Sequence, residues 1–501
     1  MLYCSYVPKS KVGIPVCDES KASPNSNIYV SKMKFNSTRG KVRGLTFEEA
    51  IFMGYANDGG LLLPEEIPSL DEDVLKKWSR LSYVDLCSEI WGLFVSESEI
   101  SKDLLGDIAL KAYGKDFSCP VTKLSESLNI LELFHGKTKA FKDIPLMIVS
   151  QFLEFFLQRQ KKHLTLLVGT SGDTGSAAIE SVRGCEQIDI IVLFPKGYCN
   201  RVQELQMTTV CDDNVYVYSV EGTSDDLDVP IKACLVDAEF VSKHNLGSVN
   251  SINIGRLISQ VVYYFYAYFK VCRKLGETVQ FVIPTGAMGN VSAGCIAYKM
   301  GLPILLQCAV NENNIVHKAL SSGQFSRPSG VVKTWSSAMD IQVPYNMERL
   351  MYLFSDFDAQ LIASLMKEFE EKGVLEIPEN LRQKIRQTVS SDWVTEDTTL
   401  ATMRSVWDTH KYLLCPHSAI GVAVASRVNS TDDSKDKAPI VCIATASPAK
   451  FLEPLEAASI SYTPPPEITG LVKMPTKCLQ MKKGENWEEM LRKTIIEIGM
   501  K

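Results

Sequence analysis

The fold is decided by residues 164–182, which read Leu164-Thr-Leu-Leu-Val-Gly-Thr-Ser-Gly-Asp-Thr-Gly-Ser-Ala-Ala-Ile-Glu-Ser-Val182. The run from Leu164 to Val168 is almost continuously apolar, as expected for a strand that is covered on both faces. A glycine-rich loop follows this run, and a helix is predicted from Gly175 to Val182. A strand, a loop and a helix in this order indicate an open α/β sheet.

The same alternation continues along most of the chain. Further buried strands are predicted at Ile188–Phe194, Val215–Val220, Val279–Ile283, Pro303–Val310 and Ile440–Ala444. Helices are predicted around them at Leu146–Lys162, Asp225–Lys243, Gly255–Lys270 and Val291–Met300. The fold class is therefore α/β, with open, mostly parallel sheets, helices on both faces and a mainly helical N-terminal domain.

Changes in composition predict where the domains begin and end. We expect an extension at 1–32, an N-terminal domain at 33–125, a small α/β domain at 126–255, a large α/β domain at 256–470 and a tail at 471–501. The extension is polar and is predicted to be disordered. Arg427–Lys437 is predicted to be a charged loop.

Composition excludes several classes of protein. The chain has 501 residues, and 53 basic against 59 acidic side chains give a net charge of −6. Because no basic stripe occurs, nucleic acid is not an expected partner. The longest apolar run, Leu257–Tyr268, is too short to span a membrane. The 14 cysteines show no zinc spacing, so we expect free thiols and no metal.

The N-terminal sequence bears on localisation. Charged residues from Lys9 to Lys21 interrupt Met1–Met33, so no secretory signal is predicted. We expect a cytoplasmic protein. Mitochondrial targeting is the alternative, although no arginine occurs before Arg39. A homodimer is compatible with the aromatic helix around Tyr263, which is predicted to form core or a subunit contact.

Three loops each follow a predicted strand, two of them rich in glycine. They span Gly169–Ala178, Pro284–Gly294 and Ala444–Phe451. Ligands of open α/β sheets bind outside the carboxyl ends of the strands, so these loops are expected to meet at one site. Neither glycine-rich loop has the spacing of a dinucleotide site, and each taken alone is equally compatible with a plain turn.

A fourth segment, Leu131-Glu-Leu-Phe-His-Gly-Lys-Thr-Lys-Ala-Phe-Lys-Asp143, contains a candidate nucleophile. Lys142 lies just before an apolar helix, where loss of solvent would lower its pKa and free its amine to attack a carbonyl. A lysine is usually a surface residue. Together with a loop that binds phosphate, however, it is the minimum requirement for a pyridoxal phosphate site.

These motifs carry a resemblance. Glu132–Asp143, Thr170–Ala178 and Asn250–Gln260 are similar to the threonine synthase family, as are Gly54–Pro64, Ala338–Asp340, Pro416-His417 and Ala449–Phe451. The matches occur in order from about Phe35 to Leu491. The overall likeness is to the animal threonine synthase-like branch, which is associated with phospho-lyase action. The family has the fold-type II pyridoxal phosphate architecture.

The resemblance implies roles for individual residues. Lys142 would form the Schiff base with pyridoxal 5'-phosphate and move protons at the substrate carbon. The other implied cofactor-binding residues are Thr285, Gly286, Ala287, Met288, Gly289, Asn290 and Thr445, with Thr445 on the ring nitrogen. The implied substrate-binding residues are Ser171, Asp173, Thr174, Asn250, Ser251, Asn253 and Arg256. Arginine suits a phosphate group because its planar fork donates two hydrogen bonds.

Some positions depart from the synthase pattern. Ala287 stands where the family has asparagine, Ser447 where it has histidine, and Lys137 where it has proline. The first two changes remove polar groups that are expected near the cofactor ring, where a synthase must guide water to the β carbon. The cofactor lysine and the glycines are unchanged.

The sequence thus favours a lyase acting on a small phosphorylated amino acid. O-phosphohomoserine or O-phosphothreonine would yield 2-oxobutyrate, ammonia and phosphate. A true threonine synthase and a non-catalytic relic that binds a partner are the alternatives. His135 could carry a proton, and a structural role is equally compatible with its place in the motif. The role of His417 is left open. The sequence predicts a helix that begins with three acidic residues, Asp225, Asp226 and Asp228. Their negative charges complement the helix dipole, so no metal site is predicted there.

Overall fold

The computed structural model describes residues 33–431 and 437–500. The predicted extension at 1–32 therefore lies outside the described residues. Within the described residues, no helix is long and apolar enough to cross a membrane, and the cysteines form no disulfide bond.

The larger sheet has six strands in the order β13-β10-β9-β14-β4-β3. These strands are β13 (Val389–Trp393), β10 (Ile304–Val310), β9 (Val279–Pro284), β14 (Ile440–Ala444), β4 (Leu128–Glu132) and β3 (Val121–Lys123). All neighbours are parallel except β3 and β4. β4 lies in the segment assigned to the small domain, yet it pairs with β14 of the segment assigned to the large domain and with β3 of the segment assigned to the N-terminal domain.

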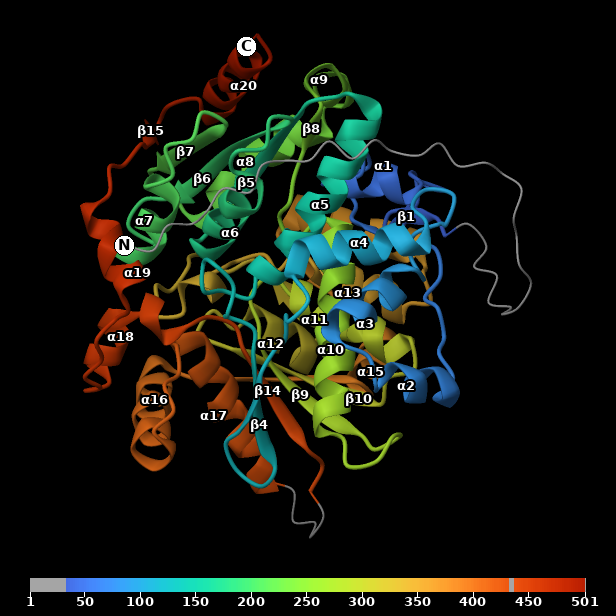
Figure 1. Cartoon of the computed structure of the whole chain (residues 1–501), viewed down its shortest axis with the longest axis vertical. Coiled ribbons are helices and arrows are strands. Elements are labelled where there is room, and N and C mark those ends of the chain that lie inside the picture. The colour runs from blue at the N-terminus through green and yellow to red at the C-terminus, as the bar shows by residue number, and fades with distance from the viewer. Residues whose placement is uncertain (1–32, 432–436, 501) are drawn as a thin grey trace. The chain divides into compact units, whose positions relative to one another are not determined.

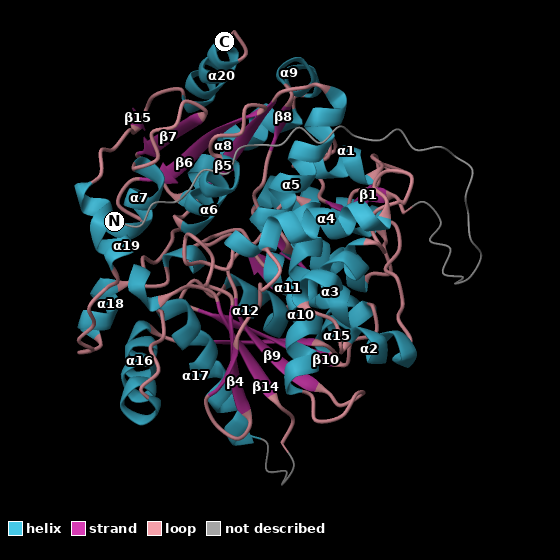
Figure 2. Cartoon of the chain, in the orientation of Figure 1, coloured by secondary structure: helices cyan, strands magenta, loops and turns pink. Residues whose placement is uncertain are grey.

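The second sheet is wholly parallel, with the order β15-β7-β6-β5-β8. Its strands are β15 (Leu479–Met481), β7 (Val215–Val220), β6 (Ile188–Pro195), β5 (Leu164–Gly169) and β8 (Leu246–Gly247). Two small antiparallel pairs also form, β1 (Phe35–Ser37) with β2 (Leu62–Pro64) and β11 (Gln324–Ser326) with β12 (Val374–Glu376). Figure 2 shows the strands of the two main sheets as separate groups.

Helices make up most of the remaining structure (Figure 1). In the first half of the chain they are α1 (Phe47–Phe52), α2 (Glu72–Trp78), α3 (Tyr83–Trp91), α4 (Lys102–Tyr113), α5 (Asp143–Gln160), α6 (Asp173–Val182), α7 (Arg201–Thr208), α8 (Ser224–Val236), α9 (Ala238–His244) and α10 (Ile254–Val271). In the second half they are α11 (Gly289–Lys299), α12 (Ile315–Ser322), α13 (Met347–Phe354), α14 (Ala359–Lys372), α15 (Glu379–Arg386), α16 (Glu396–His410), α17 (Pro416–Thr431), α18 (Leu452–Ala457), α19 (Pro466–Thr469) and α20 (Trp487–Ile498).

One helix prediction and one loop prediction need correction. The predicted helix Asp225–Lys243 is two helices, because Asp237 is extended at the junction and its side chain caps α9. The predicted loop Arg427–Lys437 is helical at its start, because α17 continues to Thr431; residues 432–436 lie outside the described residues.

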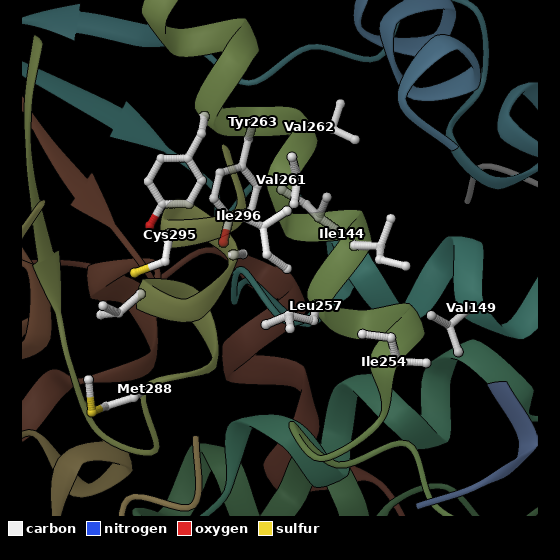
Figure 3. Close-up of a cluster of buried hydrophobic side chains, with 14 of the residues drawn as sticks. Ile144, Val149, Ile254, Leu257, Val261, Val262, Tyr263, Met288, Cys295 and Ile296 are labelled. Atoms are coloured by element: carbon white, nitrogen blue, oxygen red, sulfur yellow. The ribbon is translucent and has the colours of Figure 1, made fainter. Parts of the chain in front are cut away.

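The helix α10 lies within the hydrophobic core. Figure 3 shows Leu257, Val261 and Tyr263 of this helix among side chains of α5 and α11. Tyr263, Tyr264 and Tyr268 are fully buried, which makes the aromatic helix part of the core, one of the two roles predicted for it. Burying this many large side chains holds α10 firmly, so that its N-terminal end can present polar residues to a site at low entropic cost.

Candidate active site

One cavity gathers most of the predicted site residues. Its lining includes Lys142, Ser171, Thr174, Asn250, Ser251, Arg256, Thr285, Gly286, Ala287, Met288, Gly289, Asn290 and Thr445. These residues come from segments joined to both sheets. The segments are the loop after β5, the loop after β9, the residue after β14, the residue before α5, the loop before α10 and the first turn of α10. The expectation that the loops meet at the carboxyl ends of the strands is thus met.

Lys142 is the residue just before α5 and is almost buried, with 11% of its side chain exposed. Burial lowers the pKa of its amine, and the carboxylate of Asp173 at 3.3 Å acts in the opposite direction. The N-terminus of an 18-residue helix also disfavours a positive charge. The amine is therefore easier to deprotonate than an ordinary lysine.

Asp173 does not line the cavity, but its carboxylate lies 3.3 Å from the amine of Lys142. It forms an ion pair of 2.7 Å with Lys450 and accepts a hydrogen bond of 3.0 Å from Gln203. Burial opposes its ionisation, yet Lys450 and Lys142 hold its pKa well below the ordinary value. The sequence did not assign roles to Lys450 and Gln203, because only folding brings α7 and the segment after β14 to Asp173.

The loop between β9 and α11 has the features of an anion site. Among the described residues, nothing accepts from the backbone N–H groups of Gly286, Ala287 and Met288. Met288 has a left-handed backbone (φ 62°) at the start of α11, a strained conformation that clusters at functional sites. A Cβ on Gly286 would lie 2.7 Å from the Ala338 carbonyl oxygen, so glycine permits the close packing of the two loops.

Arg256 is the buried cation of the cavity, with 3% exposed. Its Nη1 donates to the Val249 carbonyl at 2.9 Å, whereas its Nε has no partner among the described residues. Asn250 Oδ1 and Asn290 Nδ2 also lack partners there. Buried polar atoms are normally paired, so three orphans on one cavity indicate a polar ligand.

Three other predicted positions lie elsewhere or are already paired. Asn253 is buried outside the lining, where its Oδ1 caps α10 and its Nδ2 donates to two backbone carbonyls. Ser447 is also outside the lining, and its hydroxyl caps a short 3₁₀ helix. His135 is largely exposed and pairs with Glu132.

His417 lines the cavity as a neutral side chain. Burial, with help from the two nearby lysines, lowers its pKa to about 3. Its Nε2 accepts a hydrogen bond from the Ala338 N–H at 3.2 Å, which fixes the loop that faces Gly286. The structure thus gives His417 a positioning contact.

The aspartates at positions 225, 226 and 228 have different surroundings. Asp226 forms a capping box with Thr223, and Asp225 accepts from the Gln342 N–H. Asp228 is different, because it lines the cavity. Among the described residues, no cluster of three metal-ligating side chains occurs.

Comparisons with known proteins agree with this geometry. Family models match at residues 34–113 (threonine synthase N terminus), 123–446 (pyridoxal-phosphate dependent enzyme) and 418–495 (threonine synthase, C-terminal). Threonine synthase-like 2 of Mus musculus is 48% identical over 470 residues, covering 92% of this chain and 97% of its own. Threonine synthase of Schizosaccharomyces pombe is 36% identical over 466 residues, covering 86% and 90%.

Solved structures show the same fold. Pyridoxal phosphate-bound threonine synthase from Brucella melitensis superposes with a TM-score of 0.84 at 36% identity, covering 93% of this chain and 99% of its own. Threonine synthase from yeast gives a TM-score of 0.84 at 35% identity, with 94% and 99% covered.

Proposed function

This chain belongs to the threonine synthase family of pyridoxal phosphate-dependent enzymes, and from that premise we propose that it is a phospho-lyase. The resemblance, the fold-type II architecture and the cofactor predicted from the sequence are confirmed. The proposed substrates are O-phosphohomoserine and O-phosphothreonine, and the proposed products are 2-oxobutyrate, ammonia and phosphate.

The residues of the cavity fit pyridoxal 5'-phosphate. Lys142 would hold it covalently, the free N–H groups of residues 286–288 would bind its phosphate, and Thr445 would contact its ring nitrogen. When bound, the cofactor supplies an electron sink for negative charge at the substrate α carbon. A hydroxyl at Thr445, unlike a carboxylate, would leave the ring nitrogen largely unprotonated.

The substrate phosphate fits the hydrogen-bond donors near α10, which include the unpartnered Nε of Arg256. Arg256, Asn250 and Ser251 all line the cavity, and each offers donors that suit phosphate oxygens. Burial lowers the pKa of Arg256 to about 10, which still leaves the guanidinium charged at neutral pH. A charged donor in a buried site binds an anion more strongly than an exposed one does.

Lys142 would transfer protons at the substrate carbon. Its amine, deprotonated more readily because of burial, would take the proton from the substrate α carbon. Phosphate at the β carbon can then leave directly. Phosphate at the γ carbon leaves only after a second deprotonation at the β carbon, which Lys142 could perform only after passing on the first proton.

The observation that favours a lyase over a synthase is the apolar side chain of Ala287 in the cofactor loop. Ala287 lines the cavity, and its methyl group cannot form a hydrogen bond with a water molecule. A synthase must position water for addition at the β carbon, and a misplaced water is costly. Ser447 lends no support, because it lies outside the lining.

Product analysis tests the proposal. The purified protein, loaded with cofactor, is incubated with each phosphorylated amino acid, and phosphate, ammonia, 2-oxobutyrate and threonine are measured. We expect the first three in equal amounts with little threonine. Threonine equal to the released phosphate, without keto acid, would identify a synthase. A protein that shows no visible cofactor absorbance and releases no phosphate would be the relic.

A further inference from the structure

Asp228 is a carboxyl group of the cavity that the proposed reaction has not yet used. It lies in the second turn of α8, is half-buried and is part of the lining. The carboxylates of its neighbours on the helix are engaged instead, since Asp225 accepts from the Gln342 N–H and Asp226 accepts from the Thr223 N–H. A titratable group on the wall of an active-site cavity is a candidate for acid or base catalysis.

One oxygen of Asp228 is held and the other is open. The Tyr345 hydroxyl donates to Oδ2. No described residue donates to Oδ1, which lies 3.1 Å from the position that a Cβ on Gly169 would occupy. Asn250 Nδ2 lies 3.8 Å from that same position. The missing side chain of Gly169 thus leaves Oδ1 and the Asn250 amide facing the same space.

This space adjoins the residues proposed for the substrate phosphate. Asn250 has an unpartnered Oδ1, and Ser251 accepts a hydrogen bond of 3.3 Å from Asn346, the residue after Tyr345. The Asp228–Tyr345 pair is therefore next to the proposed phosphate site on two sides, because Asp228 faces Asn250 and Tyr345 precedes Asn346, which contacts Ser251.

The surroundings of Asp228 favour its protonated form. The titratable groups that face it are Asp225 and Lys232 on its own helix, Tyr345 from the segment before α13 and Tyr55 from the segment after α1. Burial and Asp225 raise the pKa of Asp228 to about 7, against the opposing effects of Tyr345 and Lys232. A phosphate dianion placed beside the carboxyl would favour the proton further.

We propose that Asp228 is a catalytic acid that protonates the ester oxygen of the leaving phosphate, and that Tyr345 positions it. The carbon–oxygen bond breaks with its electron pair going to the phosphate oxygen, and the carboxyl proton moves to that oxygen. Water then returns a proton to the carboxylate. The inference rests on the proposed function only in that the substrate is a phosphate ester.

Leaving-group chemistry tests the proposal. Asp228→Asn keeps the size of the side chain but cannot transfer the proton, so phosphate release from O-phosphothreonine should fall by about 10²- to 10⁴-fold. β-Chloroalanine loses chloride, which needs no proton, and its turnover should stay within about threefold of the parent. Asp226→Asn on the same helix is the matched control. Cofactor absorbance verifies that each variant is folded and loaded.

The pH profile provides a second, independent readout. The parent's kcat/KM for phosphate release should decline as the pH rises above about 7, and this decline should vanish in Asp228→Asn. Tyr345→Phe removes a donor that stabilises the carboxylate, so it should move the decline to higher pH.

The outcomes separate this inference from the proposed function. Parent-like phosphate release by Asp228→Asn, or equal losses with both substrates, would overturn the acid role. A parent that forms threonine would overturn the lyase proposal alone, because phosphate leaves in both reactions. If β-chloroalanine is not turned over by the parent, a decline above pH 7 that persists in Asp228→Asn overturns the inference.

Discussion

The two ends of the cavity are built in opposite ways. At the lysine end, formed by Lys142, Asp173, Lys450 and Gln203, each charged group has partners within the protein. At the phosphate end, formed by Asn250, Ser251 and Arg256, two buried polar atoms, Asn250 Oδ1 and Arg256 Nε, have none among the described residues.

The difference indicates what each end does. A fully paired buried network fixes its lysine in place before any ligand arrives. Unpaired buried polar atoms each cost about 1–3 kcal/mol, a cost that a ligand removes when it binds. The lysine end is therefore prepared for the cofactor, and the phosphate end is completed by what binds there.

The largest effect is expected from removing the lysine. Lys142→Ala should abolish the visible absorbance of the covalently held cofactor and all turnover, because no other amine replaces Nζ. The fold should persist, since the loop at 285–290 is untouched. The matched control is Lys137→Ala, which removes an exposed lysine and should retain both signals. An unchanged lysine–cofactor adduct in Lys142→Ala would contradict the assignment.

The next effect concerns stability at the lysine end. Asp173→Asn leaves Lys450 buried without its carboxylate, so the free energy of unfolding should fall by about 3–5 kcal/mol in denaturant titrations. Because the pKa of Asp173 is lowered in the folded state, this difference should be full above about pH 4 and shrink at lower pH. Asp212→Asn breaks an exposed pair with Arg183 and should cost under about 1 kcal/mol. If Asp173→Asn and Asp212→Asn lowered the free energy of unfolding equally, burial of the Asp173 network would not contribute to stability.

At the phosphate end, Arg256→Lys should lower kcat/KM for phosphate release by about 10- to 100-fold, because lysine cannot form the planar pair of hydrogen bonds. The cofactor spectrum should not change. Arg183→Lys serves as the exposed control. A changed spectrum with unchanged kcat/KM would place Arg256 at the cofactor instead of the substrate.

A smaller effect is expected at the ring nitrogen. Thr445→Asp should shift the cofactor absorbance and lower kcat by about tenfold or less, because a buried carboxylate favours a protonated ring. Thr445→Ser keeps the hydroxyl and should resemble the parent. If the aspartate variant has the parental spectrum and rate, Thr445 does not contact the ring.

Local sequence patterns predicted the strands, the glycine-rich loops and the chemistry of Lys142, because these features lie within short stretches of chain. β5, β7 and β14 lie at the predicted positions to within one residue. The 285–290 loop lines the cavity, as the order of strands and loops suggested. Lys142 and Arg256 line it too, but the family resemblance was needed to assign them to the site.

Contacts made by distant segments could not be predicted in the same way. Lys450 forms an ion pair with Asp173, which lies 277 positions earlier in the sequence. Tyr345 donates a hydrogen bond to Asp228, which lies 117 positions earlier. Asn253 and Ser447 appeared in motifs beside functional residues, but their side chains satisfy backbone N–H groups at helix starts. A motif identifies the segment, and only packing decides which of its side chains face the ligand.

The lyase proposal and the role of Asp228 share one claim, that the phosphate end binds the substrate phosphate. A phosphonate analogue, in which CH₂ replaces the ester oxygen, cannot lose phosphate and can be titrated into the loaded enzyme by absorbance. We expect it to bind at least about 100-fold more tightly than the same amino acid without the phosphonate, and Arg256→Lys should remove most of that difference. Equal affinities for the two compounds would contradict the claim.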